Sequence, residues 1–263
     1  MVIGALLLFP IGLAVGSFLN VCIYRIPIGL SIVKPSRSFC PSCGSTISWY
    51  DNIPLLSYLI LRGRCRHCGA RISPRYPAVE LITGLLFSLL YLRFGLSVEL
   101  PEYIVMGSIL IAVSAIDIRH YIIPLKLTGP GMGIGLAFAA GLAIKSGDVS
   151  VLIERLLGGA VGAGAIFAVG VIGSLIFKKE AMGLGDVELM GMIGLYLGLY
   201  PHVILVILLS AVLGSLVGLA LIAAGRKGPK SQIPYGPFLA GGALISAFYG
   251  REIWGAYLRV MGF

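Results

Sequence analysis

Residues 158–174 read GGAVGAGAIFAVGVIGS, a run without a charged side chain and with small residues at helical spacing. The apolar character extends over about residues 155–177, which exceeds the roughly 20 residues that a helix needs to cross about 30 Å of hydrocarbon. Small residues along such a helix let a second helix approach closely. The stretch therefore predicts a membrane-spanning helix that packs against a neighbour.

The rest of the chain has the same character. Of its 263 residues 58% are hydrophobic and 12% are charged, and the mean hydropathy is +0.99. A soluble domain carries about 25% charged residues, so lipid must cover much of this surface. We predict an all-α polytopic membrane protein with about eight transmembrane helices, near residues 3–23, 78–95, 101–118, 126–144, 155–177, 186–200, 202–224 and 235–255.

The first apolar run is predicted to be a retained helix, because it has no basic segment before it and no signal-peptidase site after it. Most of the 20 Lys and Arg residues fall in the loops that follow the odd-numbered spans. Cytoplasmic loops carry the excess of Lys and Arg, so these loops are assigned to the cytoplasm and both termini to the outside. The net charge of +9 is then explained by topology. We expect membrane lipid, and no nucleic acid, as a partner.

The one long polar stretch, residues 25–77, lies between the first two predicted spans on the cytoplasmic side. It contains two Cys-x-x-Cys pairs, CPSCG and CRHCG, and a glycine follows each pair. Two such pairs are typical of a structural zinc site, because each turn supplies two thiolates and the glycine permits a positive φ. The predicted ligands are Cys40, Cys43, Cys65 and Cys68, and the glycines are Gly44 and Gly69.

Disulfides are the main alternative for these cysteines, but a reducing cytoplasm disfavours them. His67 offers a further possible ligand, yet four thiolates complete a zinc site, so we expect His67 at the surface. Cys22 falls inside the first span, where a small buried hydrophobe is its expected role. The predicted organisation is a first transmembrane helix (1–24), a zinc insert (25–77) and a transmembrane domain (78–263).

Two of the four aspartates fall at membrane-associated positions. Asp117 ends the third predicted span in VSAIDIRHYIIP, and Asp186 opens the sixth in GLGDVELM. The charge distribution puts both on the cytoplasmic side at similar depth, so the two carboxyl groups could meet. Each has a simpler explanation as well: Asp186 as a helix N-cap, and Asp117 as an ion-pair partner of Arg119 or His120.

A pair of nearby carboxyl groups has a specific chemistry. Both cannot ionise easily, so one keeps a proton while the other acts as a base. Together they can activate water and protonate a leaving amine, as aspartic proteases do. Glu188 is expected to point away from Asp186, since two residues on a helix are about 200° apart. A solvated state, or an ion pair with Lys178 or Lys179, is its expected role.

Several segments together resemble the type IV prepilin peptidase family, also called prepilin leader peptidase/N-methyltransferase. The matching stretches occur in family order: GSFLNVCIYRIP (16–27), CPSCG, DNIPLLSYLILRGRCRHCGARISPRYPAVELITG (51–84), AIDIRHYIIP, GLGDVEL and IPYGPFLAGG (233–242). The joint presence of the Gly-x-Gly-Asp element and both cysteine pairs makes the resemblance specific.

The resemblance implies an intramembrane aspartic endopeptidase of the Gly-x-Gly-Asp class in the bacterial inner membrane. It would cleave the basic leader of type IV prepilins or type II secretion pseudopilins at the cytoplasmic face, with Asp117 and Asp186 in the two catalytic positions. Family members with four cysteines are also typically N-methyltransferases that use S-adenosylmethionine. For this second activity, the resemblance implies only that the zinc-containing insert is the region involved, and it identifies no individual residues.

The sequence departs from the common family pattern at two positions. Leu125 stands where the family often has Asp, and Glu188 stands where it often has Lys; neither change removes a catalytic carboxylate. Two other functions compete with the protease. One is an ion-coupled transporter whose intramembrane carboxylates relay protons or bind a cation. The other is a methyltransferase or binding module in which the aspartates are structural.

Overall fold

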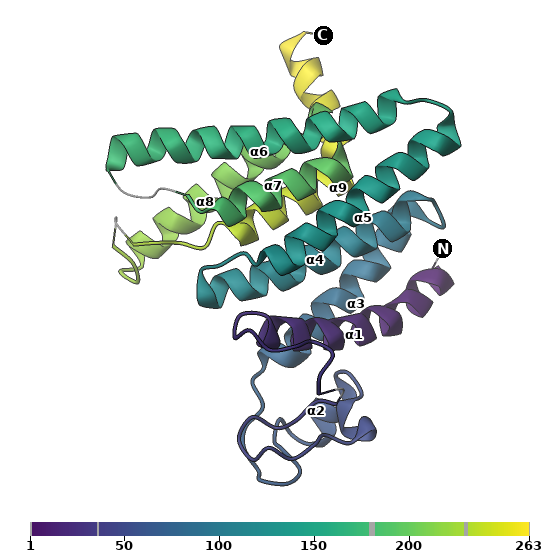
Figure 1. The fold of residues 1–263 in the computed structure, drawn as a ribbon, viewed down its shortest axis with the longest axis vertical. Helices are drawn as coiled ribbons and strands as arrows, with labels where there is room; N and C mark the ends of the chain where they lie inside the picture. The colour runs from purple at the N-terminus through teal and green to yellow at the C-terminus, as the bar shows by residue number, and fades with distance from the viewer. Residues whose placement is uncertain (1, 36, 179–181, 229–230, 263) are drawn as a thin grey trace. The chain divides into compact units, whose positions relative to one another are not determined.

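The computed structural model describes residues 2–35, 37–178, 182–228 and 231–262. Within these ranges the chain is mostly helical, with two isolated β-bridges and no extended strand. It divides into two compact units, Met1–Ile104 and Val105–Phe263 (Figure 1). The all-α prediction is therefore confirmed.

Unit 1 is built on two long helices, α1 (Val2–Arg25) and α3 (Arg75–Phe94), which pack against each other. Their close approach depends on glycines one turn apart on α1. A Cβ at Gly12 would lie 2.8 Å from the carbonyl oxygen of Thr83, and one at Gly16 would lie 2.7 Å from the Cα of Glu80. Small residues at this spacing let two helices approach closely in lipid, so the contact fixes α3 against α1.

Between these helices the chain forms the insert, which contains a 3₁₀ turn (Trp49–Asn52) and the short helix α2 (Leu56–Ile60). Two similar turns hold the cysteine pairs. In each, a backbone bridge joins the flanking residues, Phe39 with Thr46 and Arg64 with Arg71. Gly44 and Gly69 have φ of +71° and +68°, as the sequence predicted.

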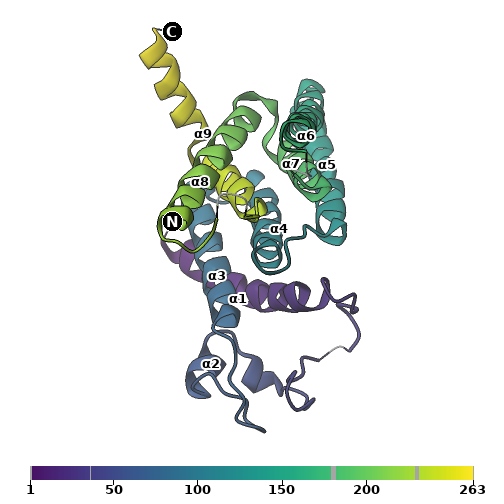
Figure 2. The ribbon, with the colours of Figure 1, turned by 90° about the vertical axis from the view of Figure 1, so that its left-hand side faces the viewer.

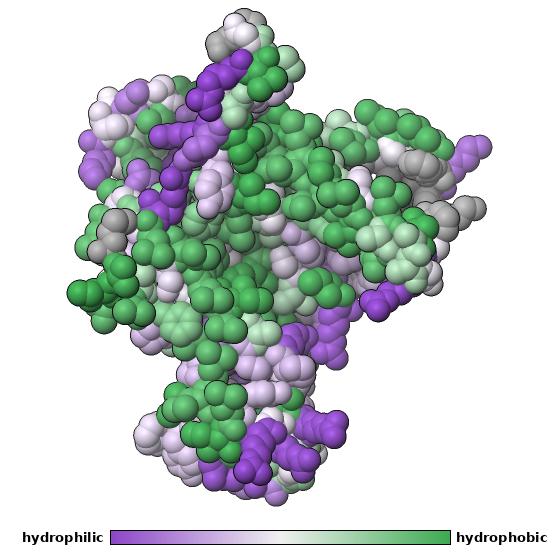
Figure 3. Space-filling model, turned by 180° about the vertical axis from the view of Figure 1, so that it is seen from behind, coloured by the Kyte–Doolittle hydropathy of each residue, from purple (hydrophilic) through white to green (hydrophobic). Residues whose placement is uncertain are grey.

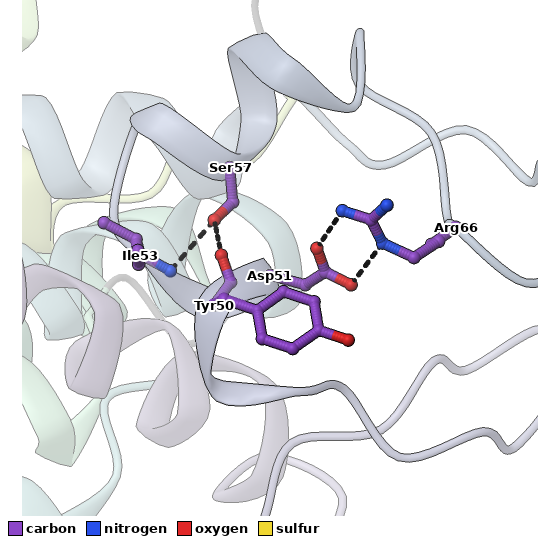
Figure 4. A network of polar contacts seen from close by, with 5 residues as sticks. All are labelled: Tyr50, Asp51, Ile53, Ser57 and Arg66. Atoms are coloured by element: carbon purple, nitrogen blue, oxygen red, sulfur yellow. Dashed lines mark hydrogen bonds and ion pairs between the residues drawn. The ribbon is translucent and has the colours of Figure 1, made fainter.

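Asp51 is the acidic residue of the insert and lies in the 3₁₀ turn. Its carboxylate accepts two hydrogen bonds from the guanidinium of Arg66, at 2.6 and 2.7 Å (Figure 4). The hydrogen bonds from Arg66 hold the pKa of Asp51 below its usual range. In the same turn, Ser57 donates to the carbonyl of Tyr50 and accepts from the amide of Ile53.

Helix α4 (Glu99–His120) begins in unit 1 and ends in unit 2. The remaining helices of unit 2 follow in chain order, and Figure 2 shows α5, α6 and α7 grouped together. They are α5 (Leu125–Ser146), α6 (Ser150–Phe177), α7 (Leu184–Leu197), a π-turn (Leu199–Val203), α8 (Ile204–Ala223) and α9 (Gly236–Met261).

The glycine-rich stretch of α6 packs against α7, as predicted. A Cβ at Gly158 would lie 2.6 Å from the carbonyl oxygen of Gly194, and one at Gly159 would lie 3.1 Å from that of Gly191. The helices therefore meet with backbone against backbone. This contact, together with contacts from α5 and α9, buries most of α7 from Leu189 to Leu197.

The expected count of about eight spans is not confirmed. Within the described residues, six helices are long and apolar enough to cross a membrane: α1, α3, α4, α5, α6 and the π-turn with α8. Helix α7 has 14 residues, about 21 Å of rise, and is a buried core helix. Helix α9 contains Arg251, Glu252 and Arg259 in its C-terminal part. A hydrophobic surface nevertheless covers much of the face in Figure 3.

Candidate active site and metal centre

Asp117 lies in the last turn of α4 and is 5% exposed. Its carboxylate accepts a hydrogen bond of 2.9 Å from the backbone amide of Gly236, the first residue of α9. This amide is at a helix N-terminus, where backbone N–H groups have no partner within the helix. A residue 119 positions away in the chain therefore fixes the carboxylate of Asp117. The expected ion pair with Arg119 or His120 is not among the contacts of the described residues.

Asp186 lies in the first turn of α7 and is half-buried. One carboxylate oxygen accepts from the amide of Gly183 at 3.2 Å, while the amide of Asp186 donates to the carbonyl of Gly183 at 3.1 Å. The carboxylate thus helps to cap the N-terminus of α7, where the helix dipole favours negative charge. The capping role that we considered is realised in part, with Asp186 in the first turn and Gly183 as the N-cap.

Ile123, in the connection between α4 and α5, brings the two aspartate-bearing segments together. A Cβ at Gly185 would lie 2.7 Å from the Cβ of Ile123, and a Cβ at Gly236 would lie 3.2 Å from its Cδ1. Gly185 is therefore required where it contacts Ile123, and Gly236 leaves little room against the same side chain. The N-terminal ends of α7 and α9 consequently meet the C-terminal end of α4, and Asp117 is near enough to Asp186 to act on it electrostatically.

The segment before α9 contributes a group that the sequence did not identify. Tyr235 is the residue before Gly236, and its hydroxyl lies 2.8 Å from the hydroxyl of Ser210 on α8. Ser210 is fully buried and donates to the carbonyl of Ile207 at 3.0 Å. Tyr235 is also within electrostatic reach of Asp186. The only signal in the sequence was the motif IPYGP, to which no chemistry could be assigned.

Glu188 points toward α5. Its carboxylate accepts a hydrogen bond of 3.2 Å from the hydroxyl of Thr128, which is fully buried. The expected ion pair with Lys178 is not among the contacts of the described residues, and Lys179 lies outside them. The partner of this carboxylate is thus a neutral hydroxyl on the neighbouring helix.

The four cysteines of the insert form one cluster, and all four are free thiols. Their sulfur atoms lie within 4.8 Å of one another, and those of Cys40 and Cys68 are 3.9 Å apart. Tetrahedral zinc with Zn–S bonds of about 2.3 Å separates its sulfur ligands by about 3.8 Å. The donor set and its spacing therefore fit such a metal. His67 is exposed and Cys22 is buried in α1, as predicted.

The protonation of these thiols is uneven. A hydrogen bond with the Ser45 hydroxyl lowers the pKa of Cys43 to about 6, and the backbone amides of Cys68 and His67 lower that of Cys65. The amide of Ala70 acts to lower the pKa of Cys68, but desolvation and hydrogen bonds with the neighbouring thiols outweigh it and raise this pKa to about 11. The lowered pKa values of Cys43 and Cys65 shift these thiols toward the thiolate form that a metal requires.

Comparisons with known proteins identify the family of this chain. Residues 11–94 match the bacterial peptidase A24 N-terminal domain, and residues 104–219 match the type IV leader peptidase family. The chain is 46% identical over 231 residues to the prepilin leader peptidase/N-methyltransferase of Myxococcus xanthus, covering 87% of this chain and 66% of that protein. No solved structure is similar to the chain.

Proteins of the same name from other bacteria match over nearly their full length. That of Pseudomonas putida is 35% identical over 274 residues, with 96% of this chain and 93% of the relative covered. That of Bacillus subtilis is 36% identical over 254 residues, with 97% and 98% covered. Together the domain matches and these relatives establish that the chain belongs to the type IV leader peptidase family.

Proposed function

We propose that this protein is an aspartic endopeptidase that removes the basic leader of type IV prepilins or type II secretion pseudopilins. The observation that carries the proposal is that the segments bearing Asp117 and Asp186 both pack against Ile123, at the ends of two helices of unit 2, which leaves the two carboxyl groups within electrostatic reach. Membership of the leader peptidase family and the names of the relatives support the substrate class.

The chemistry follows from two carboxyl groups that share one proton. The ionised carboxylate takes a proton from a water molecule, whose oxygen attacks the scissile carbonyl carbon. The protonated carboxyl group donates its proton to the carbonyl oxygen. The carboxyl group that took the proton from water then donates it to the leaving amine as the C–N bond breaks, and the other carboxylate regains a proton from a hydroxyl of the intermediate. Amide donors from Gly236 and Gly183 hold the two carboxylates in place.

The family resemblance and the charge distribution support a reaction at the cytoplasmic face of the inner membrane. Both termini then lie outside the cytoplasm, and the insert lies inside it. In the insert, Cys40, Cys43, Cys65 and Cys68 would hold a structural zinc ion. Four thiolates without an open position build structure and do no chemistry. The names of the relatives support N-methylation of the new N-terminus, with S-adenosylmethionine as the methyl donor.

The proposal is tested by incubating the purified protein with a candidate prepilin in detergent and measuring intact masses. We expect the prepilin to lose the mass of its leader whether or not S-adenosylmethionine is present. With S-adenosylmethionine, the cleaved product is expected to gain the mass of one methyl group. Ion flux in proteoliposomes without cleavage of any prepilin would instead favour the transporter.

Substitution of Gly236 by alanine tests the fixed position of Asp117. The added Cβ would lie 2.9 Å from the carboxylate of Asp117 and 3.2 Å from Ile123, so α9 or the carboxylate must shift. A displacement of about 1 Å near the reacting groups can cost about a hundredfold in rate. We expect Gly236→Ala to lower the initial rate of leader cleavage by about tenfold or more.

The matched control is Gly255→Ala on the same helix, where an added Cβ meets no atom within 4 Å. This variant should cleave at the wild-type rate. Wild-type cleavage by a folded Gly236→Ala variant would show that the contact between Gly236 and Asp117 does not matter to the reaction.

A further inference from the structure

A cavity of about 540 Å³ lies in the insert, between the end of α2 and the start of α3. Three arginines contribute to its wall, Arg62, Arg64 and Arg71, together with Tyr58, Ser73 and Pro74. All the described residues that line it are neutral or basic, and none is acidic. The cavity therefore collects positive charge with two hydroxyl groups beside it.

The backbone brings these arginines together at a cost. Arg64 and Arg71 are paired across the antiparallel bridge of the second cysteine turn, and like charges directly opposite each other are destabilising. Arg62 has a φ of +53°, a left-handed conformation that is uncommon for residues other than glycine. A costly arrangement that persists points to a functional role for these residues.

The insert has no acid left to neutralise this charge. Asp51 is the single acidic residue among residues 25–77, and its carboxylate is bound by the guanidinium of Arg66 (Figure 4). Glu80, at the start of α3, accepts a hydrogen bond from the amide of Leu55. The insert thus supplies a carboxylate for Arg66 and none for the three arginines of the cavity, which are exposed and open to an anion from outside.

The cavity lies next to a membrane-spanning helix. Ser73 and Pro74 line it, and α3 begins at the next residue, Arg75. Large apolar side chains of the insert are also exposed near it in the chain: Trp49 by 81%, Leu59 by 70% and Ile60 by 65%. Figure 3 shows hydrophobic and hydrophilic surface side by side at the end of unit 1 that carries α2. Such a surface suits the zone between lipid headgroups and acyl chains.

We propose that Arg62, Arg64 and Arg71 form a binding site for the phosphate of an anionic lipid headgroup. Guanidinium groups bind phosphate oxygens through paired, charge-assisted hydrogen bonds. Basic pockets beside transmembrane helices bind the headgroups of anionic lipids on the cytoplasmic side. The bound lipid would neutralise the three arginines and fix the insert at the membrane surface, above the start of α3.

The test uses the purified, zinc-containing full-length protein, freed of lipid in a nonionic detergent. Native mass spectrometry then measures the bound lipid during titration with phosphatidylglycerol or with phosphatidylcholine of the same acyl chains. The variant is Arg62→Gln/Arg64→Gln/Arg71→Gln. The control Arg37→Gln/Lys178→Gln/Arg226→Gln removes the same charge at exposed positions outside the cavity.

We expect the wild type and the control to prefer phosphatidylglycerol over phosphatidylcholine. The cavity variant should bind phosphatidylglycerol at least about tenfold more weakly, because each arginine near an anionic surface raises the affinity by about fivefold. Substitution of the same three residues by lysine keeps the charge and should retain part of the preference. An equal loss of phosphatidylglycerol affinity in the control would overturn the site, because the effect would then come from the overall charge of the protein.

Two further measurements exclude other roles for the arginines. Zinc content of the cavity variant should equal that of the wild type; loss of zinc would mean that the arginines serve the thiolates of the metal site. Inorganic phosphate and S-adenosylmethionine should compete only weakly with phosphatidylglycerol. Strong competition by either compound would mean that the cavity takes a soluble anion or the methyl donor, and the lipid site would be rejected.

Discussion

Replacement of Asp117 or Asp186 by asparagine should lower the rate of leader cleavage by at least about a thousandfold, as loss of a group acting directly in catalysis does. Asparagine keeps the size of the side chain and its hydrogen-bond acceptor, so the amides of Gly236 and Gly183 retain a partner. What it removes is the ability to take up or release a proton. Neither variant should fail to insert, because the helix contacts around both positions are unchanged.

The matched control is Asp148→Asn, at a third aspartate, which is exposed in the connection between α5 and α6. Its carboxylate accepts a hydrogen bond from the amide of Ser150, and the change should leave the initial cleavage rate within about twofold of the wild type, as surface changes do. A loss in only one of the two dyad variants would contradict the shared-proton mechanism, since each carboxyl group has a distinct part in it.

Removal of the metal from the cysteine cluster should unfold the insert. Between residues 26 and 74 the buried residues in the described part of the chain are Ile26, Cys40, Ser57 and Gly63, too few to form a hydrophobic core. A structural zinc ion contributes on the order of 10 kcal/mol to the folding of small domains that depend on it. We therefore expect the variant Cys40→Ser/Cys43→Ser to lose its zinc and its N-methyltransferase activity.

Leader cleavage by this variant should persist, because Asp117 and Asp186 both lie in unit 2 and the cysteines lie in unit 1. The measurements are metal content, alkylation of the remaining thiols without denaturant, and the two activities on one prepilin. Cys22→Ala, at the buried thiol of α1, should keep metal and both activities. Substoichiometric zinc in the wild type, with freely alkylated thiols, would refute the metal site.

The fold class could be predicted from hydropathy, but the number of spans could not. Helix α7 has the composition of a transmembrane helix because its residues from Leu189 to Leu197 are buried. Burial among α5, α6 and α9 selects the same apolar residues as burial in lipid. Only its length of 14 residues separates the two cases.

The two carboxylates of the site could be predicted from the sequence, but the groups that hold them in place could not. Asp117 and Asp186 were singled out because a charge beside hydrocarbon is costly, and the cysteine pairs because their spacing is specific. The amide of Gly236 comes from 119 residues beyond Asp117, and Thr128 lies 60 residues before Glu188. Such long-range contacts leave no periodic pattern in a single sequence.

The most direct test of the central claim is the intact mass of a prepilin after prolonged incubation with an equal amount of the Asp186→Asn variant in detergent. The substrate should keep the full mass of its leader, while the wild type and Asp148→Asn convert it completely. Conversion of the prepilin by purified Asp186→Asn to the product that the wild type makes would show that Asp186 is not a catalytic group.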